Sequence, residues 1–141
     1  KAFLIQKNQT PSASAMLMHP AIIVGLGGAI GSIARWGIYE LIPSNPATDI
    51  PWSTVSINLV GALLLGIIMA ISKIYNINSD IILFIAMGIL GGFTTMSTFG
   101  FETFSLIESI KTSSAIIYIL LNLLAPIMAW FGWKTTYSFI A

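Results

Sequence analysis

Apolar residues in this sequence gather in four long runs, and short polar segments separate the runs. Each run is long enough for a membrane-spanning α-helix, which needs about 20 mostly apolar residues. Because the connections are short, the pattern predicts four helices that cross the membrane alternately up and down. We expect these helices over about Pro20–Ile42, over about Trp52–Ile74, after Asp80 with an uncharged stretch from Ile81 to Phe101, and over about Ser114–Trp133.

The composition supports an all-α integral membrane protein and excludes several classes of function. Of the 141 residues, 56% are hydrophobic and 8% are charged, whereas a soluble domain carries about 25% charged residues. A net charge of +1 provides no basic surface for nucleic acid. The chain has no cysteine and a single histidine, His19, so it offers no thiolate or histidine-rich metal site. It also lacks a His/Ser/Asp set and a pair of carboxylates at one depth, so we expect no enzyme activity.

Residues 1–18 differ from the rest because they are polar and lack the apolar core of a signal peptide. We expect a tail or an expression remnant here, with Met16 or Met18 as a candidate native start. Residues 19–141 then form the membrane domain.

The positive charges at the two ends of the expected bundle are nearly balanced. Lys73 and Lys134 fall at one end, and Arg35 and Lys111 fall at the other. The positive-inside rule then gives almost no instruction on orientation. The chain could therefore insert both ways and pair with an inverted copy, or a single lysine could still fix one topology.

The third run contains two adjacent glycines, Gly91 and Gly92, followed by four hydroxyl side chains in the five positions 94–98. Glycine weakens a helix interior by about 1 kcal/mol relative to alanine, so we expect the third helix to break here, at mid-membrane depth. Backbone carbonyls freed by such a break can bind a cation such as Na⁺. The alternative is that these small residues only let helices pack closely.

Polar residues in the second and fourth runs are a second anomaly. Asn58 is the only amide in the second run, and it could donate to an anion or serve as a hydrogen bond between helices. Tyr118 and Asn122 are four residues apart and therefore share a helix face. Pro126 follows and removes the backbone donor for the Asn122 carbonyl. The polar groups on this face favour a water-lined track over a surface that contacts lipid.

The first run has its glycines in a spacing that favours close helix packing, with Gly27 and Gly31 as a GxxxG pair. Arg35 and Glu102 are the two ionisable residues deepest in the runs. A charge inside the membrane suggests a function, although both residues could also pair with each other or reach the headgroups.

Three stretches together resemble the CrcB or Fluc family of small fluoride channels, over essentially all of residues 20–140. They are Gly27-Gly28-Ala29-Ile30-Gly31 with Arg35, Thr54-Val55-Ser56-Ile57-Asn58-Leu59-Val60-Gly61, and Gly91-Gly92-Phe93-Thr94-Thr95-Met96-Ser97-Thr98-Phe99 with Glu102. The third stretch is close to the family's GGxTTFSTF signature, which is quite specific.

This resemblance implies a dual-topology, antiparallel homodimer in the cell membrane that exports fluoride passively and relieves its toxicity. A pair of paralogous chains would also fit. The resemblance further implies a structural Na⁺ at the dimer centre, held by the backbone carbonyls of Gly91 and Thr94 from both subunits. The fluoride pore positions implied by the family are Asn58, Met96, Thr98, Phe99, Tyr118 and Asn122, with Glu102 toward a vestibule.

The sequence departs from the family pattern at Met96, where phenylalanine is usual. A phenyl edge carries partial positive charge and can face an anion, whereas a thioether is soft and adaptable but has no such edge. The sequence also has Asn122 where the family often has serine.

Two other classes of membrane protein compete with the channel. A small multidrug-type exporter also has four short helices, but it needs a carboxylate inside its first helix, and this first run has none before Glu40 at its end. A non-transporting subunit is the other alternative, and it does not account for hydroxyl and amide groups at matching depths.

Overall fold

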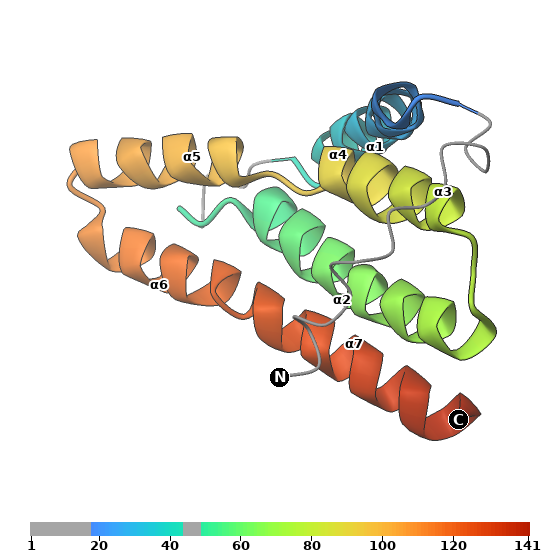
Figure 1. Cartoon of the computed structure of the whole chain (residues 1–141). Coiled ribbons are helices and arrows are strands. Elements are labelled where there is room, and N and C mark those ends of the chain that lie inside the picture. The colour runs from blue at the N-terminus through green and yellow to red at the C-terminus, as the bar shows by residue number, and fades with distance from the viewer. Residues whose placement is uncertain (1–17, 44–48) are drawn as a thin grey trace.

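The computed structural model describes residues 18–43 and 49–141, and within these ranges all regular structure is helical (Figure 1). The helices are α1 (Pro20–Leu41), α2 (Trp52–Tyr75), α3 (Ser79–Ile82), the π-helix η3 (Leu83–Leu90), α4 (Gly91–Phe93), α5 (Met96–Glu108), α6 (Thr112–Asn122) and α7 (Ala125–Ile140). They make four spans that are apolar enough to cross a membrane, with 22, 24, 30 and 29 residues. The predicted four-span, all-α membrane fold is confirmed. The prediction for residues 1–18 lies, except for Met18, outside the described residues.

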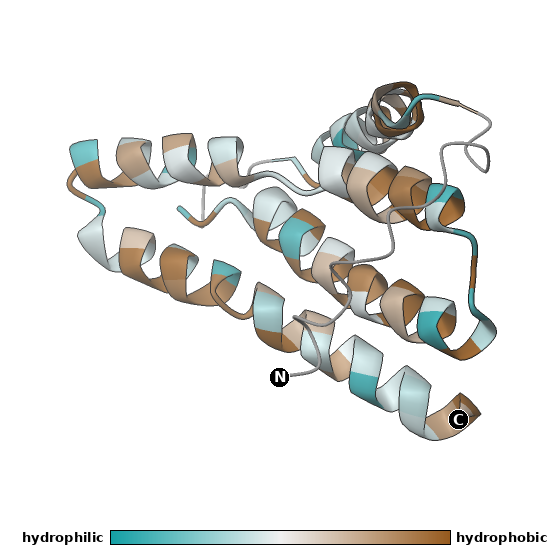
Figure 2. Ribbon diagram, in the orientation of Figure 1, coloured by the Kyte–Doolittle hydropathy of each residue, from teal (hydrophilic) through white to brown (hydrophobic). Residues whose placement is uncertain are grey.

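The helix α2 lies in the middle of the bundle (Figure 1). One side of α2 packs on α7, and the other faces the third span, which runs from α3 through α5. The helix α1 packs on the third span at η3 and α4, while α5 and α6 pack on each other. Apolar residues recur along all the spans (Figure 2), and many large apolar side chains are exposed, as expected for a protein solvated by lipid.

Glycines let the spans approach backbone to backbone. A Cβ added at Gly27 would come within 2.8 Å of the Gly88 Cα, and one added at Gly31 would overlap the Ile89 carbonyl. The predicted close packing of this GxxxG pair is therefore confirmed. The contact between α2 and α7 also depends on a glycine, because a Cβ at Gly66 would overlap the Ala129 carbonyl.

Lysines near the ends of the spans contact aromatic or acidic side chains. The Lys73 Nζ lies 5.8 Å from the centre of the Trp133 ring and 5.7 Å from that of Tyr137, within range of a cation–π interaction. At the opposite end, Lys111 forms an ion pair of 2.6 Å with Asp49. Such aromatic and basic groups are typical of the interface between a membrane and water.

The third span is broken, as predicted, but the break does not fall at the glycine pair. Gly91 and Gly92 belong to the helix α4, and the chain becomes extended at Thr94 and Thr95 instead. Gly92 serves packing, since a Cβ there would come within 2.9 Å of the Gly28 Cα. The stretch is therefore both broken and closely packed, at neighbouring positions, and the cation site stays a prediction.

The fourth span is also interrupted, between Asn122 at the end of α6 and Ala125 at the start of α7. The Leu124 N–H bonds the Leu121 carbonyl at 3.2 Å, which is the tighter three-residue spacing found at helix ends. Pro126 lies in the first turn of α7, where a proline is tolerated because that N–H needs no partner.

We expect Gly31→Ala to lower the free energy of unfolding by about 1–3 kcal/mol, since overpacking forces the backbones apart. Thermal unfolding of the purified protein in detergent measures this change. Gly25→Ala is the matched control, because a Cβ there meets nothing within 4 Å. Equal stability of the two variants would show that the α1 contact does not depend on Gly31.

Candidate functional site

The break in the third span is built by two threonines with extended backbones. Thr94 has φ −72° and ψ 156°, and Thr95 has φ −146° and ψ 118°. The Thr94 hydroxyl donates to the Leu90 carbonyl at 2.9 Å and so closes α4. The Thr95 hydroxyl oxygen accepts from the Thr98 N–H at 3.2 Å, and its hydroxyl donates to the Thr98 Oγ1 at 3.0 Å. Thr95 is thus the N-cap of α5, a role that threonine favours.

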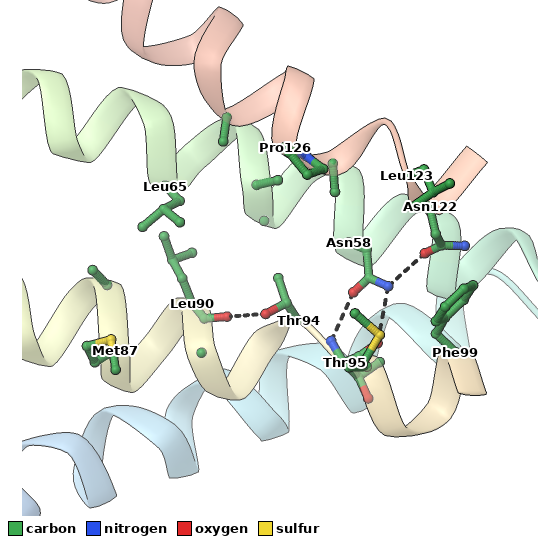
Figure 3. Close-up of a pocket in the computed structure, with 17 residues that line it drawn as sticks. Asn58, Leu65, Met87, Leu90, Thr94, Thr95, Phe99, Asn122, Leu123 and Pro126 are labelled. Carbon is green, nitrogen blue, oxygen red and sulfur yellow. Dashed lines mark hydrogen bonds between the residues drawn. The ribbon is translucent and has the colours of Figure 1, made fainter. Parts of the chain in front are cut away.

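Asn58, on α2, holds the break through three hydrogen bonds (Figure 3). Its Oδ1 accepts from the Thr95 N–H at 2.9 Å. Its Nδ2 donates to the Thr95 carbonyl at 3.2 Å and to the Asn122 Oδ1 at 2.8 Å. The side chain therefore engages both backbone groups of Thr95, and both of its own N–H groups have acceptors.

Carbonyls at the break lose the donors that a continuous helix would give them, and those of Gly91 and Thr94 are among them. In such a helix the Thr95 N–H would bond the Gly91 carbonyl, and the Thr98 N–H would bond the Thr94 carbonyl. Here Thr95 donates to Asn58, and Thr98 donates to the Thr95 side chain. The carbonyl oxygens of Gly91 and Thr94 are hard ligands of the kind that suit Na⁺.

A line of hydrogen bonds continues from Asn58 toward one end of the molecule. The Asn122 Nδ2 donates to the Tyr118 carbonyl at 3.0 Å, and the Tyr118 hydroxyl donates to the Glu102 Oε2 at 2.5 Å. Tyr118 is fully buried, and its ring packs on Phe99 with a centroid distance of 5.3 Å. These hydrogen bonds join three separate spans, and the water-lined track along α6 stays a prediction.

A cavity of 540 Å³ lies beside the break and is open on one side. Most of its wall is apolar and comes from α2, the third span and the start of α7. Met96 and Phe99 both line it, as their spacing of three residues predicts, and Met96 is 78% exposed. The chemically notable residues of its lining are Asn58, Gly91, Thr94, Thr95, Met96, Phe99 and Asn122.

A second cavity, of 420 Å³, lies at the other end of the polar line. Glu102 lines it together with Tyr39, Asp49 and Ser53. Within residues 18–43 and 49–141, Glu102 forms no ion pair with Arg35. Glu102 bonds Tyr118 instead.

The structure adds two residues to the site that were not predicted as pore positions. The Tyr39 hydroxyl and the Thr54 Oγ1 are 3.1 Å apart and share a hydrogen bond. Thr54 is fully buried on α2, and its position four residues before Asn58 on the same helix face was the available signal. Tyr39 had no such signal, since its contact with Thr54 crosses from α1 to α2.

The model of the family described as CrcB-like protein, Camphor Resistance (CrcB), matches residues 22–133. The chain belongs to the CrcB family. It is 34% identical to a fluoride-specific ion channel FluC of Thermus thermophilus, over 83% of this chain and 94% of that protein. It is 39% identical to FluC 2 of Clostridium acetobutylicum, over 77% of this chain and 90% of the relative. It is also 41% identical to FluC of Clostridium perfringens, over 73% and 81%.

Membership of the CrcB family confirms the resemblance drawn from the three sequence stretches. These relatives are named as ion channels, so the multidrug exporter and the non-transporting subunit lose their support. The family is not one of enzymes. The chain is accordingly a multi-pass integral membrane protein.

Proposed function

We propose that this chain is a subunit of a fluoride-selective channel, through which F⁻ leaves the cell passively and without coupling to ATP or protons. The observation that carries the proposal is the hydrogen-bonded line from Asn58 through Asn122 and Tyr118 to Glu102, beside the Phe99 ring. The relatives named as fluoride-specific channels support the choice of ion.

The chemistry of the line suits a small anion that has lost part of its water. Such an ion needs N–H and O–H donors, and a phenyl edge adds a weaker positive site. Among the described residues, the Asn122 Nδ2 donates only to the Tyr118 carbonyl, which leaves its second N–H for the ion. This nitrogen points away from Asn58 in Figure 3. Asn122 is therefore a better donor than Asn58, whose N–H groups are both engaged.

The open side of the larger cavity supports a dimer. It places the break, with its Gly91 and Thr94 carbonyls, beside a surface where Met96 is 78% exposed. Irregular backbone inside a membrane is tolerated only where protein or a water-filled cavity covers it. A second copy in the inverted orientation supplies that cover, and the nearly even distribution of positive charges between the two ends allows both orientations. The partner in this proposal is an identical chain, and a paralogous chain would have the same shape.

A Na⁺ ion at the centre of the dimer is the second part of the proposal. The carbonyls of Gly91 and Thr94 fit it, because their helical donors are diverted to Asn58 and Thr95. A bound cation would neutralise the partial negative charge of these oxygens and link the subunits. Its role would be structural.

We expect the purified protein in liposomes to release fluoride down its gradient, and to exclude chloride under the same conditions. A fluoride electrode and a chloride electrode measure the two effluxes. Efflux that follows an imposed proton gradient, or equal passage of chloride, would contradict a passive fluoride channel.

Within this assay, Asn58→Asp should reduce flux by about a hundredfold, because a carboxylate at mid-membrane costs about 3 kcal/mol and lacks the two N–H donors. Asn76→Asp is the control, because Asn76 is exposed beyond the end of α2. Dimer yield is measured for both variants, so that loss of folding is not mistaken for loss of conduction.

Phe99→Ile should reduce fluoride flux by about tenfold, which is the upper range of an aromatic edge interaction, while the side chain keeps its bulk. Met96→Phe restores the usual family residue and should leave the channel working. Unchanged flux in an intact Phe99→Ile dimer would mean that the ring only packs against Tyr118.

Replacement of Na⁺ by a large organic cation should lower the thermal stability of the dimer. A ligand at a hundred times its Kd stabilises the bound state by about 2.7 kcal/mol, a change that melting in detergent resolves. Dimer stability that is indifferent to the cation would remove Na⁺ from the proposal and leave the channel itself untouched.

A further inference from the structure

The helix α2 contacts the break at a second position, three residues after Asn58. Gly61 is buried there, and a Cβ added to it would overlap the Thr94 Cγ2 and lie 3.2 Å from the Phe93 Cδ1. Residues three apart lie on the same face of a helix. One face of α2 therefore holds Thr95 through the amide of Asn58 and holds the Thr94 methyl against a residue that has no side chain.

Thr94 cannot easily turn away from this contact. Its hydroxyl donates to the Leu90 carbonyl at 2.9 Å, as Figure 3 shows. Because hydroxyl and methyl share one β-carbon, the rotamer that makes this hydrogen bond also fixes the direction of the methyl. A rotation that moved the methyl off Gly61 would cost the hydrogen bond that ends α4.

We propose that Gly61 is a positioning residue for the break: its bare Cα seats the Thr94 methyl and, with Asn58, sets the extended backbone of Thr94 and Thr95. The seat consists of Gly61 and the Thr94 methyl. By fixing this backbone, it determines how the carbonyls of Thr94 and Thr95 are presented to their surroundings. The geometric part stands on its own, and only the flux readout below rests on the proposed fluoride conduction.

Another packed glycine of the same helix shows why the seat is specific. A Cβ at Gly66 would overlap the Ala129 carbonyl of α7, so its obstruction is main chain that no side-chain change can remove. At Gly61 the overlapping atom is a single side-chain methyl. Serine at position 94 removes that methyl and keeps the hydroxyl that bonds Leu90.

The test compares Gly61→Ala, Thr94→Ser and the double variant Gly61→Ala/Thr94→Ser in the full-length protein. Hydrogen–deuterium exchange of a peptide containing Thr95, followed by mass spectrometry, reports on the Thr95 N–H that bonds Asn58. Fluoride flux per folded protein is measured in liposomes. The exchange readout does not depend on which ion, if any, the protein conducts.

We expect Gly61→Ala to speed exchange and to reduce flux by at least about tenfold each, as overpacking at a rigid site does. Thr94→Ser serves as the reference for the double variant in both readouts, because it keeps the hydrogen bond to the Leu90 carbonyl. The double variant should return to within about threefold of Thr94→Ser, since the remaining contact with Phe93 requires only a small ring shift. Such a rescue supports the seat, because a general loss of packing would not be repaired by a smaller residue.

Three results would overturn the proposal. One is unchanged exchange and flux in Gly61→Ala, and another is a double variant no better than Gly61→Ala. If Gly61→Ala does not fold, the double variant must fold, and its failure to do so also overturns the seat. Gly66→Ala/Thr94→Ser is the matched control, and rescue of Gly66→Ala would show that the effect of serine is not specific. An unmutated protein without flux would contradict the proposed function, while the exchange comparison would still decide the role of Gly61.

Discussion

The hydrogen bonds between the Asn58 side chain and the backbone of Thr95 are the interaction on which the rest of the site depends. An extended backbone inside a bilayer leaves polar groups that lipid cannot satisfy, and each costs several kcal/mol when unpaired. Asn58 accepts from the Thr95 N–H and donates to its carbonyl, so one side chain satisfies both backbone groups of Thr95. The same side chain reaches Asn122 and thereby ties the break to the polar line on α6.

The glycines of the fold let neighbouring helices pack closely. Gly27, Gly31 and Gly92 bring α1 onto the third span, and Gly66 brings α7 onto α2. Close packing on both sides leaves α2 in the middle of the bundle, where its Asn58–Gly61 face meets the break. Dispersion contacts and hydrogen bonds hold the spans together, because lipid removes the hydrophobic drive for helices to associate.

The sequence predicts the four spans well, because each needs a long apolar run, and it predicts close packing at Gly27 and Gly31 from spacing alone. The break was expected at the glycine pair and lies at Thr94 and Thr95, because packing against Gly28 holds Gly92 in helix while threonine side chains end one helix and begin the next. The pore positions came from the family signature and stay predictions. Contacts between distant segments, such as Tyr39 with Thr54 or Asn58 with Asn122, leave no spacing pattern in the sequence. They could not be predicted from it.

The pairing along the polar line explains how most donors on a path for an anion can stay bonded when no ion is present. The Tyr118 hydroxyl donates to Glu102, and the Asn122 amide donates to the Tyr118 carbonyl, so these donors already have acceptors, as buried polar groups require. In the proposed channel, an arriving fluoride would accept from the second Asn122 N–H and would take the place of the oxygen that Tyr118 now bonds, so one of its hydrogen bonds already exists in the protein. Such an exchange favours an ion small enough to fit where a carboxylate or carbonyl oxygen was. Chloride is larger and a weaker acceptor, so the same exchange would leave the Tyr118 and Asn122 donors poorly bonded in a site closed by the Phe99 ring.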